Sequence, residues 1–139
     1  MSTTTLHEVD IASFVGLNID KHLTWKPHIE TVNKSIRKKI GIIYRLRNCV
    51  PQRILILLYK TLVQPHITYG IEVLGSTYET NLKCILLSQK MALRGITFSS
   101  IRTHSKPLFK KLQLLNVYLQ LHKLCIGAVS TSFTEALVY

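Results

Sequence analysis

The clearest pattern along the chain is an apolar stripe whose members recur at steps of three and four residues. Such spacing places side chains on one face of an α-helix and predicts a helix over residues 24–48. Thr24 is the expected N-cap, Pro27 fits the first turn, and Glu30 suits the positive end of the helix dipole. The stripe consists of Trp25, Ile29, Val32, Ile36, Ile40 and Ile43.

A second helix is expected to begin at Pro51, and Pro65 should kink or end it because proline has no N–H to donate. Helix is expected to resume over residues 66–74, followed by a turn over residues 75–77. The side chains expected to face inward from the second helix are Ile54, Leu57, Leu58, Thr61 and Leu62, and the tyrosines Tyr59 and Tyr69 are interpreted as packing residues.

Three further helices are expected in the last part of the chain. The first covers residues 79–94, and a loop over residues 95–104 follows it. Ser105 is the expected cap of a short helix with Pro107 in its first turn, and Asn116 is the expected cap of a helix over residues 117–128. The side chains on the buried side of the 79–94 helix are expected to be Leu82, Ile85, Leu86, Gln89 and Leu93.

The beginning of the chain favours β-structure instead. Residues 14–20 predict a short strand because Phe14, Leu17 and Ile19 are strand formers, while Gly16 indicates a bulge or a close backbone approach. A single strand must pair, either with residues 5–12 as a hairpin or with a sheet outside the chain. The expected fold is therefore mainly α, a bundle of about five helices preceded by a short β-strand or hairpin.

The chain carries a large excess of positive charge. The chain of 139 residues has 18 Lys and Arg against 7 Asp and Glu, a formal net charge of +11. Such an excess predicts attraction to polyanions, nucleic acid first and an acidic membrane surface second. Yet 47% of the residues are hydrophobic and the mean hydropathy is +0.20, which indicates apolar surface that contacts a partner.

The location of the protein is expected to be intracellular, nuclear or cytoplasmic, and not secreted. The start of the chain shows no signal-peptide pattern, and the three cysteines lie far apart without metal-binding spacing. The longest apolar stretch, residues 54–59, falls far short of the roughly 20 residues that a membrane span requires. No membrane association and no small-molecule substrate are expected.

Enzymatic chemistry is not expected from this chain alone. Nucleotidyl transfer uses paired carboxylates that hold divalent metal ions, and no two acidic residues here are adjacent. No glycine-rich phosphate loop and no nucleophile elbow is present either. We therefore expect no catalytic residues, no metal site and no cofactor in this chain. The acids are Glu8, Asp10, Asp20, Glu30, Glu72, Glu79 and Glu135.

Five segments in order resemble the region after the palm in reverse transcriptases of non-LTR retrotransposons, the jockey-like elements especially. The resemblance covers roughly residues 12–126, with Leu74 in place of the family's usual Trp. The segments are Phe14-Val15-Gly16-Leu17-Asn18-Ile19-Asp20 with Leu23-Thr24-Trp25-Lys26-Pro27-His28-Ile29, then Ile42 to Arg47, Leu58 to Gly70, Gly75 to Tyr78, and Ser88 to Arg94.

The resemblance implies where each part of the chain lies in a parent enzyme. Residues 1–24 would be the edge of the palm, with Phe14, Gly16 and Leu17 in a primer-grip-like position. Residues 25–139 would be the thumb-like and post-thumb helical region. The family's paired catalytic aspartates and the Mg²⁺ that they bind would belong to the missing palm, so the chain is expected to be inactive as a polymerase by itself.

The basic residues of the first helix are the candidate nucleic-acid contacts. Between Trp25 and Arg53 only Glu30 offsets eight Lys and Arg residues, whereas an ordinary solvated helix mixes charges of both signs. A plain solvated face is the alternative interpretation. The predicted phosphate contacts are Lys34, Lys38 and Arg45 opposite the apolar stripe, Arg37 on its flank, and Arg47. The Lys106, Lys110 and Lys111 group is left unassigned.

These observations predict a C-terminal fragment of an RNA-directed DNA polymerase that binds RNA–DNA hybrid without sequence preference. One alternative is a protein-interaction module that uses apolar surface around Phe14, Leu17 and Trp25 to bind a palm domain or another polypeptide. The other alternative is a decayed remnant without function.

Overall fold

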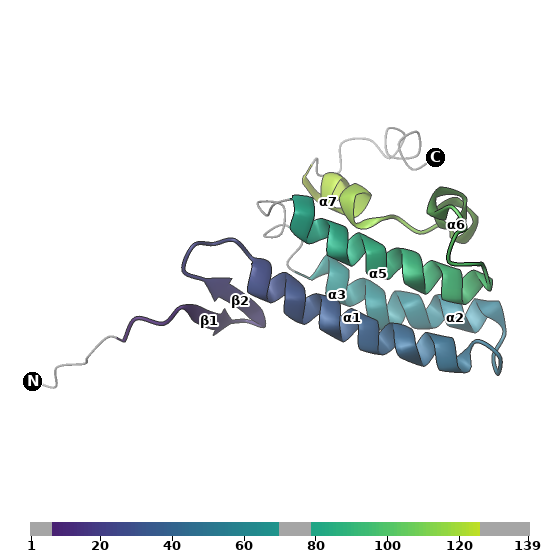
Figure 1. Cartoon of the computed structure of the whole chain (residues 1–139), viewed down its shortest axis with the longest axis horizontal. Helices are drawn as coiled ribbons and strands as arrows, with labels where there is room; N and C mark the ends of the chain where they lie inside the picture. Colours follow the sequence, from purple (N-terminus) through teal and green to yellow (C-terminus); the bar gives the residue numbers. More distant parts are fainter. Residues whose placement is uncertain (1–6, 70–78, 126–139) are drawn as a thin grey trace, which may run out of the picture.

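The computed structural model describes residues 7–69 and 79–125, and it is a bundle of helices with a β-hairpin at one end (Figure 1). The mainly α fold with a short hairpin is thus confirmed. The elements are β1 (Ile11–Phe14), β2 (Leu17–Asp20), α1 (Lys26–Leu46), α2 (Gln52–Leu58), the π-helix η1 (Tyr59–Val63), α3 (Gln64–Thr68), α5 (Glu79–Thr97), α6 (Ser105–Leu112) and α7 (Val117–Cys125). The expected helix over residues 70–74 and the turn at 75–77 lie outside the described residues.

The hairpin pairs β1 and β2 in antiparallel register, with Ile11 opposite Asp20 and Phe14 opposite Leu17. The connection is the two-residue turn Val15-Gly16, in which both residues have positive φ, 49° and 77°. Glycine suits this turn because it adopts positive φ without a steric penalty. Hairpin pairing was one of the two expected outcomes, but the predicted single strand over 14–20 was wrong, and Gly16 forms a turn and not a bulge.

Helix α1 buries the whole predicted apolar stripe, so its period was read correctly. Its N-cap was not. Trp25 occupies that position with a φ of 60° and no side-chain capping bond, and the predicted cap Thr24 lies one residue earlier. The carboxylate of Asp20 accepts hydrogen bonds from the backbone N–H of Thr24 and Trp25, at 3.1 and 2.9 Å. Glu30 lies beyond the first turn, which contains no acidic residue.

Helical structure continues from Gln52 to Thr68 through η1, so Pro65 does not end it. The N–H of Gln64 donates to the carbonyl of Tyr59, five residues back, and this wider π turn accommodates the missing N–H of Pro65. The predicted inward face was wrong for Ile54, Leu57 and Thr61, which are exposed, whereas Leu58 and Leu62 are half-buried. The buried residues are spaced by four instead: Leu55, Tyr59, Val63 and Ile67.

The π turn also explains that spacing. Residues four apart drift around an α-helix in one direction, because a turn has 3.6 residues. A π turn holds more residues and rotates the later ones back. The four side chains therefore remain on one side of a helix whose regular continuation would have turned them away.

Helices α1 and α5 run in the same direction and pack on each other, and α2 to α3 runs back in the opposite direction beside them (Figure 1). Helix α5 extends three residues beyond its predicted end, because Gly95 and Ile96 are buried against the other helices, so the expected loop begins only at Phe98. Helices α6 and α7 pack on α5 and complete the core with Leu108, Phe109, Leu112 and Val117.

The caps of the last two helices differ from each other. Asn116 caps α7 as predicted, since its Oδ1 accepts the N–H of Leu119 at 2.9 Å. Ser105 is the first residue of α6 and not its cap; His104 holds that position without a side-chain capping bond. Over the described residues, no helix is long and apolar enough to cross a membrane.

Candidate nucleic-acid interface

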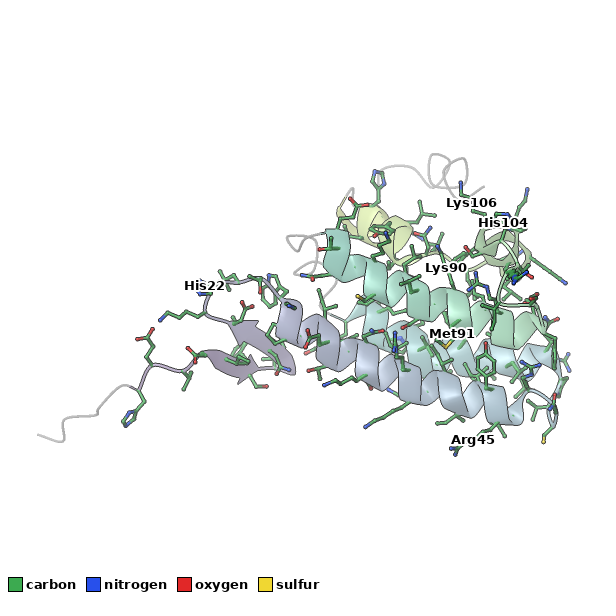
Figure 2. The ribbon with its side chains drawn as sticks, viewed as in Figure 1. His22, Arg45, Lys90, Met91, His104 and Lys106 are labelled. Atoms are coloured by element: carbon green, nitrogen blue, oxygen red, sulfur yellow. The ribbon has the colours of Figure 1, made fainter. Side chains whose placement is uncertain are left out.

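The outer face of α1 carries the cations that the sequence singled out. Lys34, Lys38 and Arg45 are exposed on the side opposite the buried isoleucines. Figure 2 shows Arg45 at the edge of the bundle, directed away from the other helices. Because the apolar stripe anchors α1 on one side, these three side chains share a direction into solvent.

Arg37 is exposed as well, and it borders α5. It lies four residues after Asn33, which accepts a hydrogen bond from Ser88 of α5 at 2.5 Å, and seven before Tyr44, whose hydroxyl donates to the carbonyl of Met91 at 3.0 Å. Residues at these spacings share a side of a helix. Arg37 therefore widens the cationic face toward the α1–α5 seam.

These cations can follow a nucleic-acid backbone. Eleven residues separate Lys34 from Arg45, a distance of about 16 Å along the helix axis. One strand of a duplex advances about 3.4 Å per phosphate, so this length corresponds to roughly five phosphates. The α1 face thus presents positive charge over about half a duplex turn.

Among the described residues, no acidic side chain forms an ion pair with this face. The only ion pair among residues 7–69 and 79–125 joins Lys21 to Glu8, at the hairpin. Lys39 is different from the exposed cations: it is half-buried, its Nζ lies 3.4 Å from Ser35 Oγ, and desolvation lowers the pKa of its ammonium. The exposed cations of α1 are consequently available to an external anion.

Arg47 has a more structural setting than the other predicted contacts. It is half-buried, and its guanidinium lies 5.5 Å from the ring centre of Tyr44 and 5.0 Å from that of Phe98. Both distances are within the range of cation–π attraction. Arg47 joins the end of α1 to the segment after α5, and its contact with phosphate stays a prediction.

The primer-grip-like residues gather at the tip of the hairpin. Phe14 is 67% exposed, Gly16 is exposed, and Leu17 is half-buried. Gly16 lies against the ring of Tyr69, whose hydroxyl donates to the carbonyl of Val15, so Tyr69 holds the turn to the bundle although it is half exposed itself. Trp25 is buried, so it cannot belong to the exposed apolar surface predicted for an interaction module.

The structure also brings together residues that sequence reasoning did not connect. Gln89 forms buried hydrogen bonds to three segments, and Lys90 of α5 lies with Lys106 of α6 at one cavity. The polar network around Gln89 could have been expected from the sequence, because a glutamine within an apolar stripe needs hydrogen-bond partners when it is buried. Within the described part of the chain, no three His, Cys, Asp or Glu side chains are placed to hold a metal ion.

The chain is similar to two mobile-element polymerases of Drosophila melanogaster. It is 24% identical over 115 residues, 81% of its length, to a probable RNA-directed DNA polymerase from transposon X-element. It is 28% identical over 87 residues, 60% of its length, to the RNA-directed DNA polymerase from mobile element jockey. The resemblance to jockey-like reverse transcriptases is confirmed.

This jockey-like region spans only 13% and 10% of the lengths of the two polymerases. Neither a protein-family model nor a solved structure matches the chain. The similarity therefore relates the chain to a part of such polymerases, and the role of that part has to be argued from its residues.

Proposed function

We propose that this chain is the thumb-like, post-palm part of a non-LTR reverse transcriptase and that it binds the template–primer duplex without sequence preference. The observation that carries the proposal is the row of exposed, unneutralised cations on α1, formed by Lys34, Lys38 and Arg45 with Arg37 beside them. The similarity to RNA-directed DNA polymerases supports an RNA–DNA hybrid as the ligand.

The mode of binding follows from the chemistry of these side chains. Lysine and arginine on a straight helix contact backbone phosphates, which position a duplex but carry no sequence information. The hairpin with Phe14, Gly16 and Leu17 lies at the start of the same helix, where it would border the primer strand. Catalysis would be supplied by the palm of the parent enzyme with its Mg²⁺, and the chain alone would not polymerise DNA.

Salt dependence tests the proposal directly. We expect the purified chain to bind a fluorescent RNA–DNA hybrid with a log-affinity that falls as log salt rises, with a slope of about −3 to −4 for roughly four phosphate contacts. A hybrid of the same length with a different base sequence should bind equally well. An affinity that does not change with salt would contradict the proposal.

A charge-reversal variant locates the contact. In Lys34→Glu/Lys38→Glu/Arg45→Glu we expect the slope of log affinity against log salt to become shallower, about −1, because each lost phosphate contact removes about one unit. The matched control is Lys60→Glu/Lys83→Glu/Lys111→Glu, which changes the same total charge at exposed lysines of η1, α5 and α6. Equal losses in both variants would mean that net charge, and not the α1 face, binds the hybrid.

The hairpin favours a second candidate function, the binding of another polypeptide. Phe14 and Val15 are each 67% exposed, and Ile11 and Leu23 are exposed as well. Apolar side chains gathered on a two-stranded ribbon are typical of a surface that a partner covers. Absence of salt-sensitive hybrid binding would favour this function, with a palm domain as the expected partner.

A further inference from the structure

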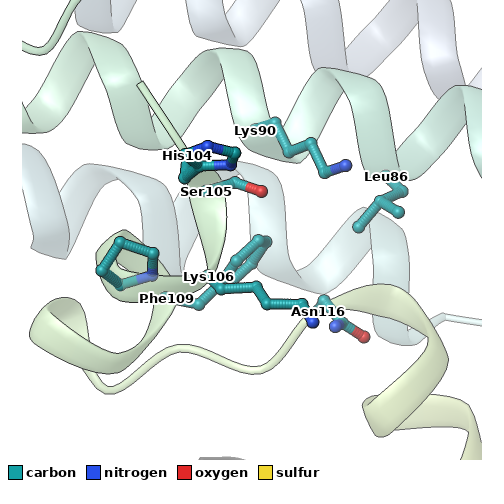
Figure 3. Close-up of a pocket in the computed structure, with 8 residues that line it drawn as sticks. Leu86, Lys90, His104, Ser105, Lys106, Phe109 and Asn116 are labelled. Atoms are coloured by element: carbon teal, nitrogen blue, oxygen red, sulfur yellow. The ribbon is translucent and has the colours of Figure 1, made fainter. Parts of the chain in front are cut away.

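A cavity of about 520 Å³ lies between α5 and α6, beside the residue that precedes α7. Lys90 extends from α5 and Lys106 from α6 along its two sides (Figure 3). Lys90 lies on the part of α5 turned toward α6, on the far side from Arg45 (Figure 2). The cavity is therefore separate from the cationic face of α1.

The walls of the cavity combine apolar and cationic groups. Leu86 and the nearly buried Phe109 give it apolar surface, while Lys90 and Lys106 bring two ammonium groups. Within the described ranges, neither lysine forms an ion pair and no carboxylate lines the cavity. An anion that enters would thus meet two uncompensated positive charges.

Pro107 and three polar side chains, those of His104, Ser105 and Asn116, complete the lining. Ser105 contributes a hydroxyl at the start of α6. Asn116 uses its Oδ1 to cap α7, which leaves the N–H₂ of its amide as a donor. Apolar walls with a few polar groups and a volume of a few hundred Å³ are typical of small-ligand sites.

We propose that this cavity binds one unpaired nucleotide. Its base would lie against Leu86 and Phe109, since bases pack well on aromatic and apolar side chains, and its phosphate would lie between Lys90 and Lys106. The inference rests on the proposed nucleic-acid binding and adds a single-strand contact to the duplex contact on α1. The nucleotide can be a free mononucleotide or the unpaired end of a bound strand, and the experiment separates these sources.

The first arm measures nucleotide binding alone, by NMR titration of the full chain with adenosine monophosphate. We expect shifts of the backbone amides of Leu86, Lys106 and Asn116 and an affinity about tenfold lower in Lys90→Ala/Lys106→Ala, since charged contacts are lost. The control Lys83→Ala/Lys111→Ala removes one exposed lysine from each of the same helices outside the cavity, and it should bind as the parent does.

Inorganic phosphate is the comparison ligand in this arm. If it shifts the same amides as strongly as the nucleotide does, or if the cavity variant binds the nucleotide normally, the proposal is overturned. Thermal melts of both variants show whether each remains folded. Because Lys83, Lys106 and Lys111 are exposed and Lys90 is only half-buried, unchanged melts are expected.

The second arm compares a blunt hybrid with one that carries a four-nucleotide single-stranded overhang. We expect the overhang to raise affinity about fivefold, in keeping with roughly 1 kcal/mol for one stacked base, and the cavity variant to lose this gain while the control keeps it. Nucleotide binding without an overhang gain identifies a free mononucleotide as the ligand. Nucleotide binding by a chain that binds no hybrid would contradict the proposed function and leave the cavity assignment standing.

Discussion

At the scale of single residues, Gln89 joins three parts of the chain. Its Nε2 donates to the hydroxyl of Tyr59 at 3.0 Å and to the carbonyl of Leu115 at 3.4 Å, and its Oε1 accepts the N–H of Val117 at 2.8 Å. Gln89 and Tyr59 are fully buried, and burial raises the pKa of the Tyr59 phenol to about 12 although the Gln89 bond opposes this. A buried hydrogen-bond donor or acceptor that loses its partner lowers the free energy of unfolding.

Replacement of Gln89 should therefore destabilise the fold more than its volume suggests. We expect Gln89→Met to lower the free energy of unfolding by about 3 kcal/mol, because the Tyr59 hydroxyl and the Val117 N–H both lose a partner. Tyr59→Phe, which removes one hydrogen bond and keeps the ring, should cost about 1 kcal/mol. Urea denaturation measures both, and equal losses would show that the bond from Val117 to Gln89 contributes nothing beyond the bond between Gln89 and Tyr59.

At the scale of elements, the packing of α1 on α5 depends on a glycine. A Cβ at Gly95 would lie 2.8 Å from Cε2 of Tyr44, closer than carbon atoms approach. The Tyr44 ring is held from two sides, by its hydroxyl bond to Met91 and by the guanidinium of Arg47. A side chain at position 95 would have to displace the ring from these two contacts, so Gly95 allows the two helices their present separation.

Gly41 of α1 and Gly95 of α5 should respond in opposite directions to substitution by alanine. Gly41→Ala in α1 has no atom within 4 Å of the new Cβ and should stabilise the fold by about 0.5 to 1 kcal/mol, since alanine is the better helix former. Gly95→Ala gains the same propensity but forces Tyr44 to move, and a net loss of about 1 kcal/mol is expected. Thermal denaturation of the two variants measures these changes. Stabilisation by both substitutions would contradict the proposed contact between position 95 and Tyr44.

At the scale of the whole molecule, the hairpin depends on the bundle. A two-stranded hairpin is marginally stable alone, so its bonds to the helices matter. The N–H of Asn18 donates to Nδ1 of the buried His28 at 3.3 Å, and its Nδ2 donates to Thr31 Oγ1 at 3.3 Å, while Tyr69 holds the turn. His28 is 3% exposed, and desolvation lowers the pKa of its imidazole below 6.5.

This depressed pKa predicts a loss of stability on mild acidification. The unfolded chain binds a proton at His28 near pH 6.5 and the folded chain does so only at lower pH, so the free energy of unfolding should fall as pH drops below about 6.5. One proton limits the slope to about 1.4 kcal/mol per pH unit. Urea denaturation at pH 7.5 and 5.5 measures it, and a His28→Gln variant should show a flatter dependence.

Asp20 acts in a separate pH range. Burial raises the pKa of its carboxyl, but the hydrogen bonds from Thr24 and Trp25 outweigh this and lower the pKa below 3.8. The stabilising effect of the ionised carboxylate is therefore present above that pH and is lost only in stronger acid.

The His28→Gln variant tests the assignment to His28. If its free energy of unfolding falls as steeply between pH 7.5 and 5.5 as that of the parent chain, another histidine carries the effect.

The sequence by itself determined α1, its buried stripe and its charged outer face, because helical periodicity is a local property that burial on one side imposes. The cap of α7 by Asn116 was equally local, since donor and acceptor lie three residues apart. The mainly α class and the jockey-like resemblance also followed from the order of residues alone. These features need no knowledge of what packs where.

Only the tertiary structure decided the features that depend on distant partners. The inward face of α2 was set by the helices that it packs against, which bury Leu55 and leave Leu57 exposed, and α5 continued past Gly95 because Tyr44 of another helix packs there. The cavity between Lys90 and Lys106 arises in the same way, since residues sixteen positions apart meet there only when α6 packs on α5.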